Sequence, residues 1–212
     1  MDLTTYLQDE RQALPAALSA DDDARAARYQ AALASMTYPE LSAFLAAIGA
    51  FAPCSCLDVG IAYGAQYFAL QENFAGVTWT GCEISPVYRA AFAALLPAGP
   101  APAVLAVSDY SSMPEIADGA YDVVTSRSML CHYGAPHAFA IIDEMLRIAG
   151  RAVVIKTYYP PSFDAPVYTE LPPDHAGGGW LVEWSLPEWS AYVQGKTVEW
   201  DRDTNRTVII RK

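Results

Sequence analysis

An acidic residue and a run of small residues stand together at Asp58-Val59-Gly60-Ile61-Ala62-Tyr63-Gly64, directly after an apolar stretch. Small residues let a ligand approach the backbone closely, and the first turn of a helix offers backbone N–H groups that have no partner within the helix. The next apolar run along the chain ends in Glu83. In nucleotide-binding folds, an acidic side chain at this place accepts hydrogen bonds from ribose hydroxyls.

A further carboxylate follows the third apolar run, in Ser108-Asp109-Tyr110. In open parallel sheets, ligands bind beside the carboxyl ends of the strands. Because Glu83 and Asp109 each stand at such an end, we expect a site for a nucleotide-type ligand at this edge. The alternatives are that both are solvated carboxylates at strand ends, and that Asp58 mainly holds its turn by hydrogen bonds to nearby N–H groups.

These residues need a scaffold in which strands and helices alternate. Strand-like runs stand at residues 56–59, 77–83, 103–107, 121–125 and 151–156, and helical patterns at residues 64–73, 86–96 and 136–149. Alternation of this kind predicts βαβ units and an α/β fold with a mostly parallel sheet.

Both ends of the chain differ from this core. Residues 1–52 favour helix, most clearly in the alanine-rich segment 24–36, and we expect an N-terminal helical cap there. Residues 158–186 are rich in Pro, Gly, Tyr and Trp and predict a long loop or a partial cap over a substrate. Residues 187–212 predict a last helix and a β-hairpin that complete the cofactor-binding core of residues 53–157.

The composition argues against several classes of function. The chain has 212 residues, of which 53% are hydrophobic, enough for the core of one domain. Its net charge of −11 argues against a nucleic-acid partner, because such binding rests mainly on Lys and Arg. No stretch approaches the roughly 20 apolar residues that cross a bilayer, so we expect no membrane partner. The start lacks the features of a signal peptide, and four cysteines then indicate reduced thiols in the cytoplasm.

Over residues 54–157 the chain resembles the class I S-adenosylmethionine-dependent methyltransferases. Residues 58–64 are similar to the acidic, glycine-rich first motif of that family, with Ala62 in place of the usual middle glycine. Residues 121–126 resemble the family's fourth strand, residues 144–148 the helix before the fifth strand, and the predicted hairpin the antiparallel seventh strand. The resemblance implies a Rossmann-like, mostly parallel seven-stranded sheet with a terminal antiparallel hairpin, and S-adenosylmethionine as the cofactor.

The resemblance also implies roles for individual residues. Glu83 would bind the ribose, and Asp109 would meet the adenine amine with Tyr110 beside the ring. The end of the fourth strand, at Ser126, would face the methionine part of the cofactor. The implied cofactor-binding set is Asp58, Gly60, Ala62, Gly64, Glu83, Asp109, Tyr110 and Ser126.

The methyl acceptor is expected just beyond the fourth strand. His132 stands where many members of the family have a histidine, and it is a candidate base because imidazole titrates near neutral pH. A structural role for this histidine is the alternative. Arg127 and Tyr133 are candidate substrate contacts, Arg127 for a carboxylate or phosphate. Trp180 is a third candidate contact, in an aromatic segment whose other interpretation is a fixed contact in a homodimer.

The sequence therefore predicts an enzyme that transfers a methyl group to an oxygen or nitrogen of a small, partly apolar molecule. The cysteine spacing matches no common zinc site, so no metal is predicted. A nicotinamide-dependent oxidoreductase is one alternative, but its fingerprint has glycines where this chain has Ala62 and Ala65, and Gly64 has the methyltransferase spacing. A cofactor-binding protein without catalysis is the other alternative.

Overall fold

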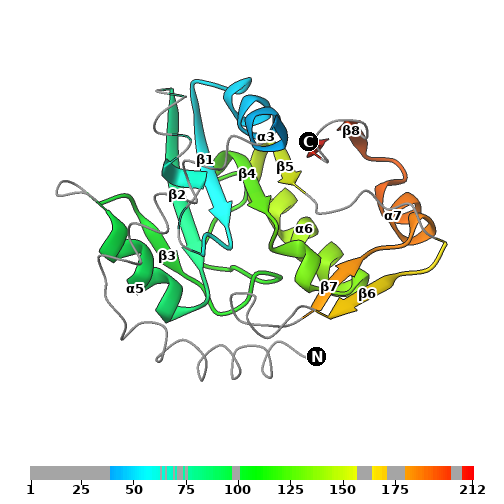
Figure 1. The fold of residues 1–212 in the computed structure, drawn as a ribbon. Helices are drawn as coiled ribbons and strands as arrows, with labels where there is room; N and C mark the ends of the chain where they lie inside the picture. The colour runs from blue at the N-terminus through cyan, green and yellow to red at the C-terminus, as the bar shows by residue number, and fades with distance from the viewer. Residues whose placement is uncertain are drawn as a thin grey trace.

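The computed structural model describes residues 39–62, 64, 66–68, 70, 74, 76–96, 101–156, 164–170, 180–201 and 207–212. Its centre is a seven-stranded sheet with the strand order β3-β2-β1-β4-β5-β9-β8 (Figure 1). The sequence prediction of a Rossmann-like, mostly parallel seven-stranded sheet is confirmed. The helix expected at residues 24–36 lies outside the described residues.

Five strands form the parallel part of the sheet, and their bounds lie close to the predicted ones. They are β1 (Cys54–Val59), β2 (Val77–Glu83), β3 (Val104–Ala106), β4 (Tyr121–Arg127) and β5 (Ala149–Lys156). Because these strands run in the same direction, their carboxyl ends all lie at one edge of the sheet. The candidate carboxylates therefore stand at the edge where ligands bind in folds of this kind.

The predicted terminal hairpin is also confirmed. Strand β9 (Thr207–Arg211) pairs antiparallel with β5 on one side and with β8 (Thr197–Asp201) on the other. The last strand of the chain thus lies inside the sheet, and β8 forms its edge.

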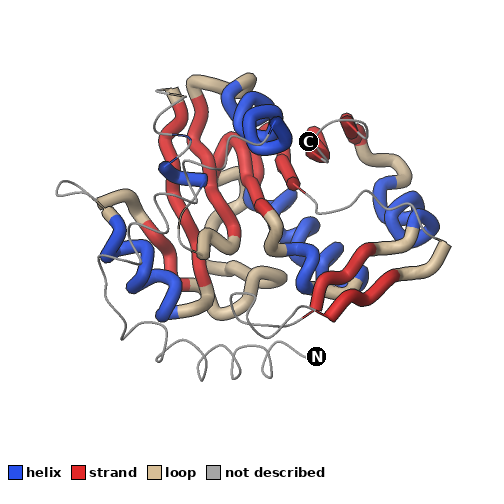
Figure 2. The backbone as a smooth tube through the Cα atoms, in the orientation of Figure 1, coloured by secondary structure: helices blue, strands red, loops and turns tan. Residues whose placement is uncertain are grey.

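Helices pack on both faces of the sheet (Figure 2). Helices α3 (Pro39–Gly49) and α5 (Pro86–Leu95) contribute Phe44 and Phe92 to a buried cluster with Cys56 on one face. Helix α6 (Ala135–Ile148) covers the other face, where Ile141 packs with Val124. Alternate residues of each strand therefore enter opposite cores, as expected for a parallel sheet buried on both faces.

Part of the segment after β5 has regular structure. The sequence predicted a loop or partial cap at residues 158–186, and the described part of this segment contains two antiparallel strands, β6 (Val167–Glu170) and β7 (Trp180–Glu183). The β-branched and aromatic residues of both strands favour extended backbone, a signal outweighed in the sequence by the surrounding Pro and Gly. Helix α7 (Leu186–Val193) then begins with a capping box between Ser185 and Glu188.

No helix within the described ranges combines the length and apolar character needed to cross a bilayer.

Candidate active site

The turn after β1 is fastened to the end of β2 by backbone hydrogen bonds. The N–H of Gly60 donates to the carbonyl of Cys82 at 3.0 Å, and the N–H of Ala62 donates to Glu83 Oε2 at 3.0 Å. Gly60 and Gly64 have φ angles of +75° and +76°, which glycine adopts without strain. Ala62 has a φ of +47°, so the residue that departs from the family motif keeps the left-handed backbone of the glycine it replaces.

Close packing requires glycine at two positions of this turn. A Cβ on Gly60 would lie 2.7 Å from Met129 Cγ, and one on Gly64 would lie 2.2 Å from the Phe92 ring. The turn therefore approaches both the segment after β4 and helix α5 without side chains of its own between them. This leaves the backbone of the turn close to the carboxyl edge of the sheet.

Glu83 is the centre of the hydrogen bonds at the end of β2. Its Oε1 accepts from the N–H of Ser85 and from the hydroxyl of Tyr110, both at 2.9 Å. Burial raises the pKa of Tyr110, so this hydroxyl keeps its proton and donates it. Both side chains are almost fully buried. The structure thus joins Ala62, Glu83 and Tyr110, three of the predicted cofactor residues, in one connected group.

Asp109 lies one strand further along, after β3. Its Oδ1 accepts from the N–H and the hydroxyl of Ser111, both at 2.8 Å, which closes a tight turn. Among the described residues, Oδ2 has no hydrogen-bond partner. This oxygen can accept a hydrogen bond from a ligand, such as an exocyclic amine.

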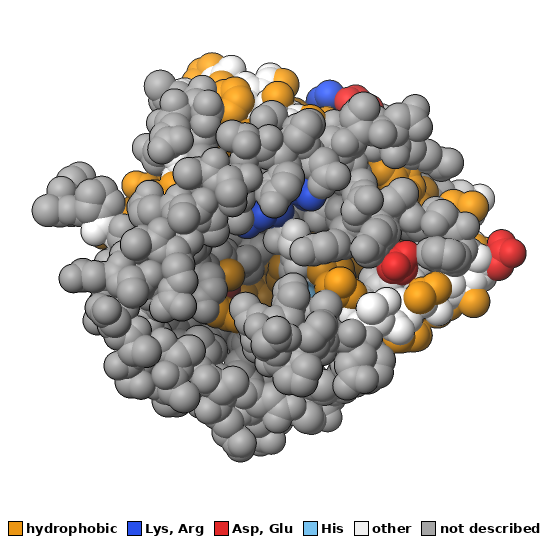
Figure 3. Space-filling view, viewed as in Figure 1, with side chains coloured by type: hydrophobic (Ala, Val, Ile, Leu, Met, Phe, Trp, Pro, Cys, Tyr) orange, Lys and Arg blue, Asp and Glu red, His pale blue; other side chains and the backbone are white. Residues whose placement is uncertain are grey.

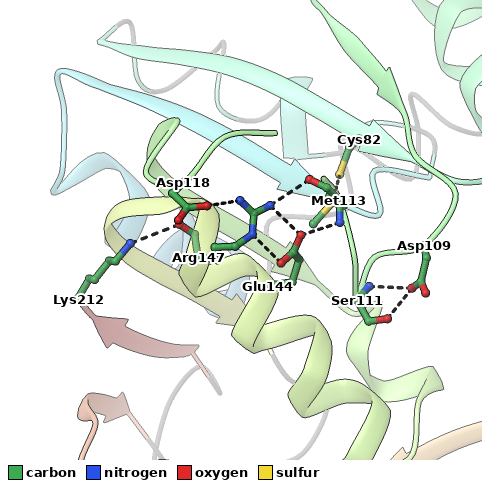
Figure 4. A network of polar contacts seen from close by, with 8 residues as sticks. All are labelled: Cys82, Asp109, Ser111, Met113, Asp118, Glu144, Arg147 and Lys212. Atoms are coloured by element: carbon green, nitrogen blue, oxygen red, sulfur yellow. Dashed lines mark hydrogen bonds and ion pairs between the residues drawn. The ribbon is translucent and has the colours of Figure 1, made fainter. Parts of the chain in front are cut away.

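A network on helix α6 holds the same loop from its other end (Figure 4). Glu144 Oε1 accepts from the N–H of Met113 at 2.6 Å, and Arg147 Nη2 donates to the Met113 carbonyl at 3.0 Å. Arg147 also pairs with Glu144 and with Asp118. The loop between Asp109 and Asp118 is therefore anchored to a helix that lies on the core.

Asp58 lies beneath the turn in a buried polar cluster that sequence reasoning did not find. Thr125 donates to Asp58 Oδ1 at 3.5 Å, and Gln66 Nε2 donates to Thr125 Oγ1 at 2.6 Å. Burial raises the pKa of Asp58 to about 7, against the opposing effect of the Arg127 charge. Thr125 has no sequence signal of its own, because only the pairing of β1 with β4 brings it to Asp58, and Gln66 joins the cluster through Thr125.

The end of β4 is strained and tied to its neighbours. Ser126, a predicted cofactor residue, is buried and donates its hydroxyl to the carbonyl of Val59 at 3.2 Å, so its side chain fastens β4 to β1. Arg127 follows, half-exposed, as the last residue of the strand. Ser128 has a φ of +59°, and its N–H donates to the Lys156 carbonyl at 3.2 Å. Strained backbone of this kind clusters at functional sites.

His132 ends a short 3-10 helix, η1 (Leu130–His132), that follows this strained turn. The His132 side chain is half-exposed, and the next residue, Tyr133, places its ring 4.9 Å from the ring of His137. Trp184, which follows β7, donates from Nε1 to the Tyr133 carbonyl at 3.1 Å. The β6–β7 hairpin is thereby attached to the candidate acceptor side. The side chain of Trp180 lies outside what the structure describes.

The structure therefore gathers the predicted residues in two groups. The cofactor candidates stand at the ends of β1 and β2, after β3 and, for Ser126, near the end of β4. The acceptor candidate Arg127 ends β4, and His132 and Tyr133 follow that strand. Among the residues that the structure describes, two other than glycine have a positive φ, Ala62 and Ser128, and they lie in the turns after β1 and β4. In the described part of the chain, no three His, Cys, Asp or Glu side chains are grouped to hold a metal ion.

Comparison with solved structures finds many proteins of the same fold. One is CalS10 with bound S-adenosylmethionine, an amino pentose methyltransferase from Micromonospora echinaspora (TM-score 0.60, 16% identity, 86% of this chain and 95% of that chain). Another is the glycopeptide N-methyltransferase MtfA complexed with sinefungin (TM-score 0.62, 12% identity, 82% and 92%). A third is magnesium protoporphyrin IX methyltransferase from Synechocystis PCC 6803 with bound S-adenosylmethionine (TM-score 0.54, 17% identity, 87% and 79%).

No curated protein matches the sequence significantly. A family model described as a methyltransferase domain matches residues 57–154, which run from β1 to β5 and include both groups of candidate residues. The residues at this edge fit such a cofactor chemically, since Glu83 and Asp109 offer carboxylate oxygens of the kind that accept hydrogen bonds from hydroxyl and amino groups. The chain therefore carries a class I S-adenosylmethionine-dependent methyltransferase domain, and S-adenosylmethionine is its cofactor.

Proposed function

We propose that this methyltransferase acts on an oxygen or nitrogen atom of a small, partly apolar molecule. The observation that carries the proposal is the placement of Arg127 at the end of β4, with His132 and Tyr133 shortly after it, at the same edge of the sheet as Glu83 at the end of β2. The structurally similar proteins give support, because their names describe methylation of an amino pentose, a glycopeptide and a porphyrin.

Cofactor binding is assigned to the ends of the first three strands. Glu83 would accept hydrogen bonds from the ribose hydroxyls, held in orientation by Ala62, Ser85 and Tyr110. Asp109 would accept from the adenine amine through Oδ2. The backbone of the turn at Gly60 would lie against the methionine part of the cofactor, with Met129 packed against the position where a Gly60 side chain would stand. Bound S-adenosylmethionine supplies an electrophilic methyl group on its sulfonium.

The chain's own residues then have to orient the acceptor and accept its proton. His132 is the proposed base, because histidine is the side chain that most often acts as a general base and this one lies half-exposed at the end of η1. The attachment of Trp184 to the Tyr133 carbonyl holds this segment in place. We propose that the β6–β7 hairpin covers part of the acceptor and helps to exclude water.

The apolar part of the acceptor is proposed from the surroundings of η1. Leu130 is buried in the core, Met129 and Tyr133 pack against that core, and the Trp184 ring packs on Phe139 with ring centroids 5.4 Å apart. A small molecule with an aromatic or aliphatic body would find apolar contacts there, while Arg127 offers it a charged one.

The test begins with the cofactor. We expect S-adenosylhomocysteine to raise the melting temperature and NADH to leave it unchanged. With the cofactor established, a panel of hydroxylated and aminated aromatic compounds is incubated with S-adenosylmethionine, and formation of S-adenosylhomocysteine is followed by mass spectrometry. His132→Ala should lower turnover by about 10²-fold while leaving the affinity for S-adenosylhomocysteine nearly unchanged. Full turnover in that variant would show that His132 is structural.

A further inference from the structure

The carboxyl ends of β4 and β5 both finish in a basic residue. Arg127 ends β4, Lys156 ends β5, and the two are partners in the parallel register. Because side chains alternate along a strand, the side chains of both residues leave the sheet on the same face as Thr125 and Val154, the pair two positions earlier. Figure 3 shows Lys and Arg atoms near the centre of the face that it draws.

Two like charges on adjacent strands are unfavourable unless something else balances them. Among the described residues, Arg127 has no ion-pair partner. Its charge acts on Asp58, but that carboxyl is buried and has a pKa raised to about 7, so it is only partly ionised at neutral pH. The chain as a whole has a net charge of −11, which makes a pair of neighbouring cations at a ligand-binding edge a specific feature.

The backbone holds this pair of cations next to the candidate acceptor segment. The N–H of Ser128 donates to the Lys156 carbonyl at 3.2 Å, and Cys131 Sγ donates to the Ser128 carbonyl at 3.0 Å. The Lys156 charge acts on the thiol of Cys131, the residue before His132. Arg127 thus faces the turn after β1, and Lys156 lies within electrostatic reach of η1.

We propose that Arg127 and Lys156 together bind an anionic group of the methyl acceptor, a carboxylate or a phosphate. The proposal rests on the function proposed above and narrows its substrate class to acceptors that carry such a group. The planar guanidinium can donate two parallel hydrogen bonds to the anion, and the ammonium adds a compact second charge. In an acidic protein, which repels anions at long range, two local cations would be needed to retain such a substrate.

The test uses the full chain saturated with S-adenosylhomocysteine and two pairs of probes. Benzoate is compared with benzamide, and phenyl phosphate with phenol, by isothermal titration calorimetry. We expect at least one anion to bind saturably and at least tenfold more tightly than its neutral partner. Arg127→Gln and Lys156→Gln should each weaken anion binding about tenfold, whereas Arg127→Lys should retain part of it.

Arg211→Gln is the matched control, because it removes the same charge from the opposite end of the β5–β9 pair. Its anion affinity should equal that of the wild type, and circular dichroism with S-adenosylhomocysteine affinity shows that each variant is folded. Equal affinity for anions and neutral partners, no saturable anion binding, or an equal loss in Arg211→Gln would overturn the proposal.

The cofactor also carries a carboxylate, and a second comparison separates it from the acceptor. Affinities for S-adenosylhomocysteine and for 5′-methylthioadenosine, which lacks the amino-acid part, are measured for wild type and Arg127→Gln. We expect both affinities of Arg127→Gln to stay within about twofold of the wild-type values. A tenfold loss for S-adenosylhomocysteine alone would assign Arg127 to the cofactor and overturn the proposal. Failure of the wild type to bind S-adenosylhomocysteine would contradict the proposed function instead.

Discussion

Ala62 lies in the first turn and Asp58 in β1 just before it, and both are unusual: the backbone of Ala62 is strained, and the pKa of Asp58 is raised. Ala62 has the left-handed backbone that its family motif normally gives to glycine, and Asp58 is a carboxyl group buried beneath it. The strained backbone of Ala62 and the buried carboxyl of Asp58 both lie beside the proposed cofactor site, where strained residues and perturbed pKa values are expected.

Replacing Ala62 with glycine should stabilise the protein. The variant Ala62→Gly removes a Cβ from a residue with a φ of +47°, and we expect the free energy of unfolding to rise by about 0.5–1 kcal/mol. Urea denaturation measures the change. Ala140→Gly, at an exposed position of α6, is the control and should instead lower the free energy of unfolding by about 1 kcal/mol. A loss of stability in both variants would show that Ala62 is not strained.

The raised pKa of Asp58 predicts that the free energy of unfolding falls as the pH rises. Its pKa is about 7 in the folded protein and near the ordinary 3.8 when unfolded, so the folded state binds the additional proton between these values. Protonation of Asp58 therefore adds to the free energy of unfolding, and this addition is fully present below about pH 4 and is lost as the pH rises through 7. The full difference in the free energy of unfolding is of the order of 4 kcal/mol, at about 1.4 kcal/mol for each pKa unit.

The variant Asp58→Asn removes this titration while keeping the shape of the side chain. We expect the difference in free energy of unfolding between pH 5 and pH 8, measured in urea, to change by roughly 2–3 kcal/mol relative to the wild type. Asp122→Asn, at the other end of the β1–β4 pair, serves as the control because hydrogen bonds from Ser55 lower the Asp122 pKa. Identical pH profiles for wild type and Asp58→Asn would contradict the raised pKa.

At the scale of elements, helix α6 positions the loop that carries Asp109, a residue of the proposed cofactor site. Arg147 and Glu144 bind both the N–H and the carbonyl of Met113, and the Met113 side chain is buried with its sulfur 4.0 Å from that of Cys82, the residue before Glu83. The helix before β5 therefore connects the loop after β3 with the end of β2. Glu144 and Arg147 therefore support the loop of the proposed cofactor site from the helix behind it.

Arg147→Lys tests this connection because lysine keeps the positive charge but lacks the planar guanidinium that makes the paired hydrogen bonds. We expect the affinity for S-adenosylhomocysteine to fall by about threefold to tenfold, because Asp109 loses part of its support. The affinity for free adenosine should fall by the same factor, since the loop faces the adenine in the proposed pose. Arg211→Lys, in the exposed pair with Glu199, should leave both affinities unchanged. Unchanged adenosine affinity in Arg147→Lys would separate the network from the cofactor site.

For the whole molecule, the net charge of −11 and the pI near 4.5 set the response to salt. A chain far from its isoelectric point loses stability through self-repulsion, which added salt screens. We expect the melting temperature at pH 7.5 to rise by about 2–4 °C between low salt and 0.3 M NaCl, equivalent to roughly 1 kcal/mol. The same salt should have little effect at pH 4.5. A fall in melting temperature at pH 7.5 would show that specific ion pairs outweigh the net charge.

The sequence by itself determined most of the parallel sheet and the residues at its carboxyl edge. The strands ending in Val59, Glu83 and Lys156 are local patterns of apolar residues, and the turn that starts at Gly60 follows from the need for small residues. Such signals are local because period, turn chemistry and helix capping depend on neighbours in the chain. For the same reason, Glu83 could be assigned from its position after the turn.

Tertiary structure alone decided which polar groups meet. Thr125 reaches Asp58 only because β4 pairs with β1, and Lys156 stands beside Arg127 only through the register of β4 with β5. Contacts between residues far apart in the chain depend on strand order, and a one-residue slip in register would send every side chain to the other face of the sheet. The charge of Asp58 and the pairing of two cations are therefore properties of the folded sheet.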